Sequence, residues 1–529
     1  MANKKLFANK TNKTVAAAPV MVLNQAGGMA YKLSDKEALA QFAVTGCFGG
    51  TFYASDDSQL ENAKKLVPLV EPEFLAKLCL YSRESGFMKD APAFLLAVLL
   101  VRSPELFKKV FPRVVDNAKM LRNFVQIVRS GVTGRKSLGS MPKRLIAEWI
   151  NSRTNEQLFN DAVGNDPSLK DVICMSHPKP VNKEREALYA YICENEKRMG
   201  ELTEELPKVI KDFEAFKNAK AEERVVPSNV SFQRLTSLNL TSNDWKQIAR
   251  GMSYNQLRMN LNTLARHDVF VSGNTVDHEM VKYVADRLSD EKAVAKVKVF
   301  PYELFAAYMN LDEKVPNDIR VALEVAVQHS IKKLSKIEVD GILVAVDSSG
   351  SMQSPATGNR TVASKMSCNH VASLMASCLL AANPLSTKIV RFDTAVEEMY
   401  LSPANTVMQN ASVLNRSGGG TNCSLPLALW NKQGKKANLV VYLSDNESWM
   451  DRGGYHHSTG MKAEWEIFKK NNPQAKLVCI DITPNATTQA ATSKDVLNVG
   501  GFSSAVWTVI HSFLTGQGNF VEEIEKIQI

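Results

Sequence analysis

The sequence lacks a long apolar segment. Its most apolar run, Ala91–Val101, is shorter than the roughly 20 residues that a membrane-spanning helix needs. The polar, basic N-terminus has no apolar stretch ahead of a cleavage site, so we expect no signal peptide. None of the eight cysteines lies at CxxC spacing, which argues against a zinc site and a disulfide framework. These absences favour a cytoplasmic protein with reduced thiols and no membrane partner.

Basic charge is concentrated in one block. The net charge is +9 over 529 residues, a length that predicts two or more domains. Residues 336–529 hold 16 basic and 16 acidic side chains, so the first 335 residues carry the whole excess. Residues 101–150 alone hold 11 basic and 3 acidic side chains, a net +8. A polyanion responds to such a local field more than to the overall charge.

The N-terminal part reads as a succession of short helices. Apolar residues recur at three-and-four spacing in each segment, and prolines or glycines separate the segments. This pattern predicts stacked antiparallel helix pairs, as in HEAT-like helical repeats, although no strict sequence period is present. The expected helices include residues 35–44, 72–85, 91–103, 105–115, 118–131, 142–153 and 185–198.

The pattern changes near residue 336. β-branched runs of strand length alternate with helical stretches, which predicts a doubly wound α/β domain with a parallel sheet covered on both faces. We therefore expect an N-terminal tail over 1–24, a helical part over 25–335 and an α/β domain over 336–529. The expected strands are residues 341–346, 387–393, 438–445, 476–482 and 504–510.

Oxygen-bearing side chains follow two of the expected strands. In ILVAVDSSGSM the first strand runs into a carboxylate and two hydroxyls at alternate positions, and VVYLSDNES brings a second carboxylate. RSGGGTNCS places a threonine after three glycines. Ligands of such sheets bind at the carboxyl ends of the strands, and hard oxygen donors suit Mg²⁺ or Mn²⁺ better than zinc. The candidate ligands are Asp347, Ser349, Ser351, Thr421 and Asp445.

Three other interpretations of this segment are weaker. A nucleophilic serine would need a G-x-S-x-G elbow and a histidine, and the elbow does not occur. The glycines before Thr421 are not followed by the lysine of a phosphate-binding loop. A polar turn that caps the next helix stays open as the structural alternative.

These five residues resemble the metal-ion-dependent adhesion site of von Willebrand factor A (vWA) domains. The resemblance implies that Asp347, Ser349 and Ser351 contact the ion directly or through water, and that Thr421 and Asp445 complete the set. It also implies that the open position of the ion accepts a carboxylate from a partner protein, so that the site binds and does not catalyse.

The basic block predicts a nucleic-acid surface, because phosphate backbones are the commonest anions that require so many cations. For any single side chain, a solvated helix face is the competing interpretation. His177, in CMSHPKP, stands before a proline, where a cap role is usual, but it could also contact phosphate or stack on a base. The candidate nucleic-acid contacts are Arg102, Lys108, Lys109, Arg113, Arg129, Arg135, Lys136, Lys143, Arg144, His177 and Lys179.

Further segments resemble the Ro autoantigen family, and its bacterial members in particular. Residues 47–66, 144–149 and 176–180 are similar to its TROVE module, and GGGTNCSLP and LSDNES to its vWA domain. The resemblance implies a HEAT-like ring joined to a vWA domain. Small non-coding Y RNAs would bind the outer basic surface, with His177, Lys143 and Arg144 among the contacts. Single-stranded 3′ ends of misfolded RNAs would enter the centre.

The leading hypothesis is therefore a non-catalytic RNA-binding ring that serves as a scaffold in RNA quality control. The resemblance implies an exoribonuclease partner such as polynucleotide phosphorylase, and we expect a monomeric ring unless RNA links several copies. A metal-dependent protein–protein adaptor is the alternative from another class. A metal-dependent nuclease or phosphotransferase centred on Asp347 is a third, which predicts that the pure protein turns over RNA.

Overall fold

The computed structural model of the protein describes residues 19–45, 55–164, 167–297, 299–332, 337, 339–356, 365–450, 459–483 and 485–529. Part of the family-like segment 47–66 and most of the expected tail thus lie outside the described residues. Within them, no helix is both long and apolar enough to cross a membrane.

Between Asp35 and Ile331 the regular secondary structure of the described residues is helical, apart from a small hairpin of β3 (Val271–Ser272) and β4 (Thr275–Val276). Three short 3-10 helices are η1 (Val67–Leu69), η2 (Thr203–Glu205) and η3 (Ala221–Glu223). The α-helices are α1 (Asp35–Thr45), α2 (Asp56–Leu66), α3 (Pro72–Glu84), α4 (Asp90–Arg102), α5 (Pro104–Val114), α6 (Ala118–Ser130), α7 (Ser140–Ser152), α8 (Asn155–Asp161), α9 (Leu169–Ser176), α10 (Lys183–Ile192), α11 (Glu196–Glu201), α12 (Lys208–Asn218), α13 (Phe232–Leu235), α14 (Ser242–Gly251), α15 (Tyr254–Met259), α16 (Leu261–Arg266), α17 (His278–Ser289), α18 (Glu291–Val297), α19 (Pro301–Met309) and α20 (Asn317–Ile331).

The C-terminal part is an α/β domain. Its strands are β5 (Ile342–Asp347), β6 (Thr387–Phe392), β7 (Val396–Met399), β8 (Leu439–Ser444), β9 (Lys476–Asp481), β10 (Thr487–Thr488) and β11 (Val496–Gly500). Its helices are η4 (Gly350–Gln353), α21 (Cys368–Ala382), α22 (Val407–Leu414), α23 (Leu425–Gln433), α24 (Gly460–Asn471), α25 (Ser504–Leu514) and α26 (Phe520–Glu525). The predicted order, a helical part followed by an α/β domain with a parallel sheet, is confirmed.

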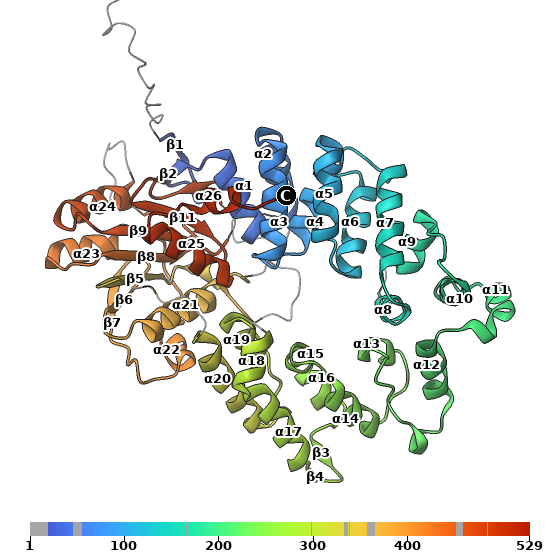
Figure 1. Ribbon diagram of the computed structural model, residues 1–529. Helices are drawn as coiled ribbons and strands as arrows, with labels where there is room; N and C mark the ends of the chain where they lie inside the picture. Colours follow the sequence, from blue (N-terminus) through green and yellow to red (C-terminus); the bar gives the residue numbers. More distant parts are fainter. Residues whose placement is uncertain are drawn as a thin grey trace, which may run out of the picture.

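The helices follow a circuit that returns to the α/β domain (Figure 1). At its start, α1 packs on β11 and α26, and α3 packs on α26. At its end, α19 and α20 pack on α21, and α20 also packs on α22. The rings of Phe87, after α3, and Phe300, before α19, lie 5.2 Å apart. The first and last helices therefore meet each other as well as the same domain, which closes the circuit.

The sheet has the strand order β11-β9-β8-β5-β6-β7. All neighbours are parallel except the edge strand β7, which is antiparallel to β6. From the central β5 the chain first goes to β6 on one side and later to β8 on the other. This reversal is the topological switch point, where the carboxyl ends of β5 and β8 form the usual ligand crevice of a doubly wound sheet.

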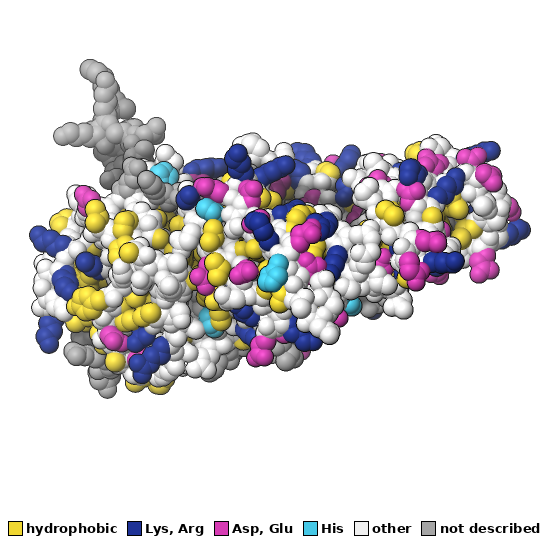
Figure 2. All heavy atoms as spheres, turned by 90° about the horizontal axis from the view of Figure 1, so that it is seen from below, with side chains coloured by type: hydrophobic (Ala, Val, Ile, Leu, Met, Phe, Trp, Pro, Cys, Tyr) yellow, Lys and Arg dark blue, Asp and Glu magenta, His cyan; other side chains and the backbone are white. Residues whose placement is uncertain are grey.

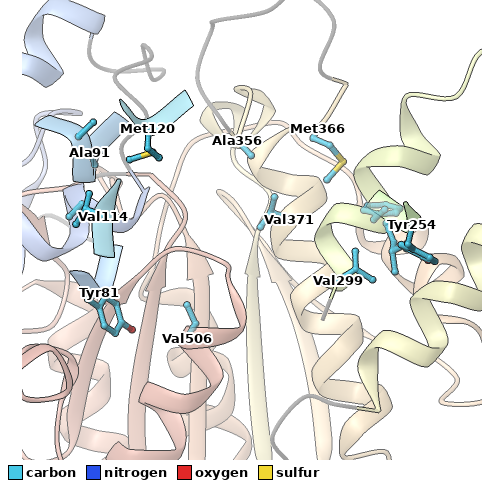
Figure 3. Close-up of a cluster of buried hydrophobic side chains, with 14 of the residues drawn as sticks. Tyr81, Ala91, Val114, Met120, Tyr254, Val299, Ala356, Met366, Val371 and Val506 are labelled. Carbon is cyan, nitrogen blue, oxygen red and sulfur yellow. The ribbon is translucent and has the colours of Figure 1, made fainter. Parts of the chain in front are cut away.

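Each face of the sheet is buried. α23 and α24 cover one face with an apolar cluster that includes Trp430, Trp465 and Phe468. The other face belongs to a continuous cluster that extends into the helical part. Figure 3 shows part of this cluster, with Tyr81 of α3 and Val114 of α5 from the start of the circuit and Tyr254 of α15 and Val299, just before α19, from its end. A shared core therefore holds the helical circuit to the α/β domain.

The segment before α1 belongs to the α/β domain. β1 (Met21–Leu23), within the expected tail, pairs with β2 (Met29–Lys32), and β2 pairs with β10. The turn between β1 and β2 packs on the loop after β8, where Asn24 Nδ2 donates to the Ser448 carbonyl at 2.8 Å. N- and C-terminal segments are thus interlocked.

Two elements differ from their predictions. Residues 504–510 were expected to form a strand and instead lie in helix α25. Ser503 caps this helix through the Ala505 N–H, and its apolar residues recur at helical spacing; the last strand is β11. The helix expected over 185–198 is broken into α10 and α11, because Glu194 takes φ 56° and Asn195 caps α11.

Replacement of Gly28 tests the interlocked N-terminus. A Cβ on Gly28 would lie 2.0 Å from the Ser448 carbonyl oxygen, so Gly28→Ala has to displace the turn from the loop after β8. We expect a lower Tm in calorimetry and faster proteolysis near the N-terminus. Gly200→Ala is the control, because a Cβ there meets nothing within 4 Å and Gly200 lies in a helix. Equal Tm changes in the two variants would contradict the docking.

Candidate metal centre and nucleic-acid interface

The first candidate site lies at the switch point of the sheet. Asp347 ends β5 and is fully buried. Its Oδ1 accepts from the Ser349 N–H at 2.8 Å, and its Oδ2 accepts from the Ser444 hydroxyl at 2.5 Å. Ser444, the last residue of β8, was not among the predicted ligands. The neighbouring strand therefore orients the carboxylate.

The remaining predicted ligands lie around this carboxylate. The hydroxyls of Ser349 and Ser351 are 3.2 Å apart, and the Ser351 hydroxyl also bonds the Asp445 carboxyl group. The Thr421 carbonyl accepts from the Trp449 N–H at 3.2 Å, which ties the threonine loop to the loop after β8. All five candidate ligands are at most 4% exposed. They form one buried group from three loops.

Glycines allow these loops to approach. The Gly418 N–H donates to the Ser348 carbonyl at 2.8 Å, and the Gly350 N–H donates to the Gly419 carbonyl at 3.0 Å. Gly419 has φ +73°, and a Cβ on Gly420 would lie 2.5 Å from Met450 Sδ. The glycine run therefore brings Thr421 to the carboxyl ends of β5 and β8.

The electrostatics of the group favour a cation. Burial, and then the charge of Asp445, raises the pKa of Asp347. Burial also raises the pKa of Asp445, although the Ser351 hydroxyl opposes this shift. Neither carboxylate has a Lys or Arg partner among the described residues. Two carboxylates and three hydroxyls fit Mg²⁺ or Mn²⁺, whose charge would replace the protons.

The candidate metal site contains two acidic side chains, Asp347 and Asp445. Among the described residues, no group of three or more His, Cys, Asp or Glu side chains is placed to hold a metal ion. The Asp347 group has two carboxylates, and its other donors are hydroxyls, which is the composition predicted from the sequence.

The second candidate site is the basic block of α4 to α7. Three of its predicted contact residues are engaged within the protein. Arg102 Nη1 donates to the carbonyls of Val67 and Val70, and Arg113 forms a two-pronged ion pair with Glu84 at 2.8 Å. Arg135 donates to the carbonyls of its own loop, at Ser137 and Leu138. These arginines hold the fold together.

The other cations of the block have no acidic partner at short distance among the described residues. Arg144 is the partial exception, since it lies 3.7 Å from Glu148 with both side chains 62% exposed. Such an exposed pair contributes little and leaves the guanidinium available. Among the predicted contact residues of the block, the remaining cations, which have no ion pair with a described residue, are Lys108, Lys109, Arg129, Lys136 and Lys143.

His177 and Lys179 lie at the opposite end of α7 from Lys143 and Arg144. The His177 N–H donates to Ile173 at the end of α9, where the histidine takes φ 49°. The Lys179 carbonyl accepts from Asn151 Nδ2 at 3.1 Å, in the last turn of α7. Eight residues of helix separate Lys143 from Asn151, which is about 12 Å. The predicted RNA contacts therefore form two groups, which adjacency in the sequence had not indicated.

Charge elsewhere is mixed. Residues 151–335 hold 26 basic and 27 acidic side chains. On the face in Figure 2, Lys and Arg are interspersed with Asp and Glu. The net positive field of the helical part therefore arises from residues 101–150.

The chain is similar to known proteins along most of its length. Residues 341–514 match the family model described as the Ro60 vWA domain. The chain is 24% identical over 538 residues to the RNA-binding protein RO60 of Deinococcus radiodurans, with 94% of this chain and 96% of that one aligned. It is 21% identical over 592 residues to the RNA-binding protein RO60 of Caenorhabditis elegans, with 94% and 90% aligned.

A solved structure shares the fold. The crystal structure of the Deinococcus radiodurans RO (RSR) protein superposes with a TM-score of 0.61 at 20% identity. The match covers 92% of this chain and 100% of that one. The helical part followed by a vWA domain is therefore the architecture of both proteins.

The pH dependence of stability tests the buried carboxylates. Without divalent ions, the raised pKa makes folded Asp347 bind more protons than unfolded Asp347 above its ordinary pKa of 3.8. The free energy of unfolding of the parent therefore falls as pH rises from about 4 to the raised pKa of about 7. Asp347→Asn removes this cost, so its Tm advantage over the parent in EDTA should grow from pH 5 to pH 8.

Mg²⁺ at pH 8 should reverse that order, because only the parent keeps the ligand set. Calorimetric Tm values at the two pH values, with and without Mg²⁺, make the comparison. A pH-independent difference that Mg²⁺ does not alter would show that Asp347 is not a metal ligand.

Proposed function

Because the chain belongs to the Ro60 family, with a Ro60 vWA domain and homology to Ro60 proteins over most of its length, we propose that it is a non-catalytic RNA-binding protein. It acts as a scaffold that holds structured and misfolded RNAs for processing. The similarity to two RNA-binding RO60 proteins, from Deinococcus radiodurans and Caenorhabditis elegans, supports RNA as the ligand.

The observation that carries this proposal is the placement of charge. A net +8 on residues 101–150 stands beside a helical remainder and an α/β domain that are nearly neutral. Several of these cations lie on the surface without an acidic partner among the described residues. Phosphate groups supply the missing negative charge, and the release of counterions drives binding.

The two groups at the ends of α7 fit two kinds of RNA contact. The group around Lys136, Lys143 and Arg144 supplies phosphate contacts to any RNA. His177, at the other end of the helix, adds a base or sugar contact to a structured RNA that also binds the first group. Y-like RNAs would use both ends, and single-stranded 3′ ends would use the first group on their way to the centre of the circuit.

The Asp347 group is proposed to hold Mg²⁺ or Mn²⁺ through Asp347, Ser349, Ser351, Thr421 and Asp445. When bound, the ion offers an open coordination position to a carboxylate of a partner protein. Trp449 and Met450, beside Thr421, are partly exposed and border the group. An exoribonuclease held there would work on RNA held by the helices, so the adaptor role and the RNA role are parts of one scaffold.

Removal of three cations tests the phosphate surface. Each lost phosphate contact flattens the slope of log K against log salt by about 0.7 to 0.9 unit. Lys136→Ala, Lys143→Ala and Arg144→Ala together should lower the slope by about two units and weaken both a Y-like RNA and a single-stranded 3′ tail. Filter binding at several salt concentrations measures both quantities.

Two controls accompany this test. Ala at Lys208, Lys282 and Lys332 removes the same charge from exposed lysines that pair with Asp212, Asp286 and Glu291, and it should leave the slope unchanged. Asp347→Ala should bind both RNAs as the parent does, and no variant should shorten them. An unaltered slope in the first triple variant would make the block a solvated face, and RNA cleavage that needs Asp347 would favour the nuclease.

His177→Ser tests the second group. One neutral side chain contributes little to the salt slope, whereas loss of a base or sugar contact costs on the order of 1–3 kcal/mol. We expect the variant to weaken the Y-like RNA and to spare the single-stranded tail. His177 is exposed but ends α9 in the left-handed region (φ 49°), so the Tm of the variant is measured beside its affinities. Equal losses for both RNAs would show that the two ends of α7 do not act separately.

A further inference from the structure

A second buried acidic group lies beside the first. Asp481 ends β9, and both of its carboxylate oxygens lack a hydrogen-bond partner among the described residues although the residue is 1% exposed. Its register partner on β8 is Ser444, the residue that binds Asp347. Two strand spacings therefore separate Asp347 from Asp481, roughly 10 Å. The second group thus has its centre at Asp481 and adjoins the Asp347 group through Asp445.

Glu447 approaches Asp481 from the loop after β8. It is 1% exposed, its Oε1 has no partner among the described residues, and its Oε2 accepts from the Ala26 N–H at 3.2 Å. Burial, and then the charges of Glu447 and Asp445, raises the pKa of Asp481, although the Asn446 side chain opposes this shift. No Lys, Arg or His pairs with either residue in the part of the chain that the structure describes.

Two buried amide side chains add oxygens without partners. Gly500 is the register partner of Asp481 on β11, and the two residues project to the same face of the sheet. A Cβ on Gly500 would lie 2.0 Å from Gln41 Oε1, so this oxygen lies over the end of β11 next to Asp481. Neither polar atom of the Gln41 side chain has a partner among the described residues.

Gln489 completes the group from the segment after β10. Its Nε2 donates to the Asn446 carbonyl at 3.3 Å, between Asp445 and Glu447, while its Oε1 has no partner among the described residues. Gln41 and Gln489 are both fully buried. Unpaired buried carboxylates and amide oxygens are costly, and here they are gathered at one place.

We propose that Asp481, Glu447, Gln41 and Gln489 form a second binding site for a hard divalent cation of the Ca²⁺ type. Two carboxylates balance its charge, and the amide oxygens suit Ca²⁺, which accepts six to eight oxygen ligands in a flexible geometry. The ligands come from α1, from the loop after β8, from β9 and from the segment after β10. The ion therefore fastens the N-terminal segment to the vWA domain.

The test removes the Asp347 site by substitution and measures how many Ca²⁺ ions the Asp481 site binds. In the full chain with Asp347→Ala, calorimetry with Ca²⁺ should still show one bound ion and a Ca²⁺-dependent rise in Tm. Addition of Asp481→Asn should abolish both. Addition of Asp495→Asn should leave both intact, because Asp495 pairs with Lys469 at 3.2 Å, away from the site.

Gln41→Met in the Asp347→Ala chain covers the case in which the Asp481 variant does not fold. Met keeps the length of the side chain and removes its oxygen, so Ca²⁺ affinity should fall by about tenfold or more. Failure of the Asp347→Ala chain to bind millimolar Ca²⁺ would overturn the proposal and make Asp481 a protonated carboxyl group. An unchanged affinity in the Gln41→Met chain would also overturn it.

Discussion

The contact on which the structure depends is the shared apolar core between the two ends of the helical circuit and the vWA domain. The curvature of a stack of short helices follows from the rotation between neighbours, so a succession of helices does not by itself return the last one to the first. Here α1, α3, α19 and α20 all pack on the same domain, and the Phe87–Phe300 contact joins the early helices to the late ones. The domain thereby sets the geometry in which the basic surface of α5 to α7 is presented.

This arrangement places the basic surface and the buried carboxylates in two different parts of the molecule. The cations lie on helices α5 to α7 and the loop between α6 and α7, and the buried carboxylates lie at the carboxyl edge of the sheet. The proposed RNA surface and the proposed ion site are therefore separate in chemistry and in place. The sheet can bury unpaired carboxylates because Ser444 and Ser351 hydrogen-bond them and an ion can neutralise them. The basic surface instead remains hydrated and available to phosphate.

Local pattern predicted most of the fold. Strand-length β-branched runs identified β5, β6, β8 and β9, and the residues that follow β5 and β8 predicted the Asp347 group, because the ends of parallel strands share one edge. The same logic failed for residues 504–510, where a capping serine and helical spacing prevail over β-branched composition. Local sequence pattern did not predict contacts between distant segments. The interlocked N-terminus, the separation of His177 from Lys143 and the cluster around Asp481 all depend on tertiary packing.

The central claim, that the basic block is the RNA surface, is tested most directly by ultraviolet crosslinking of the full chain to a Y-like RNA, followed by identification of the crosslinked peptides. The account predicts crosslinks concentrated in residues 101–150 and around His177. Crosslinks spread over residues 183–331, where acidic and basic side chains alternate, or confined to the vWA domain, would contradict it.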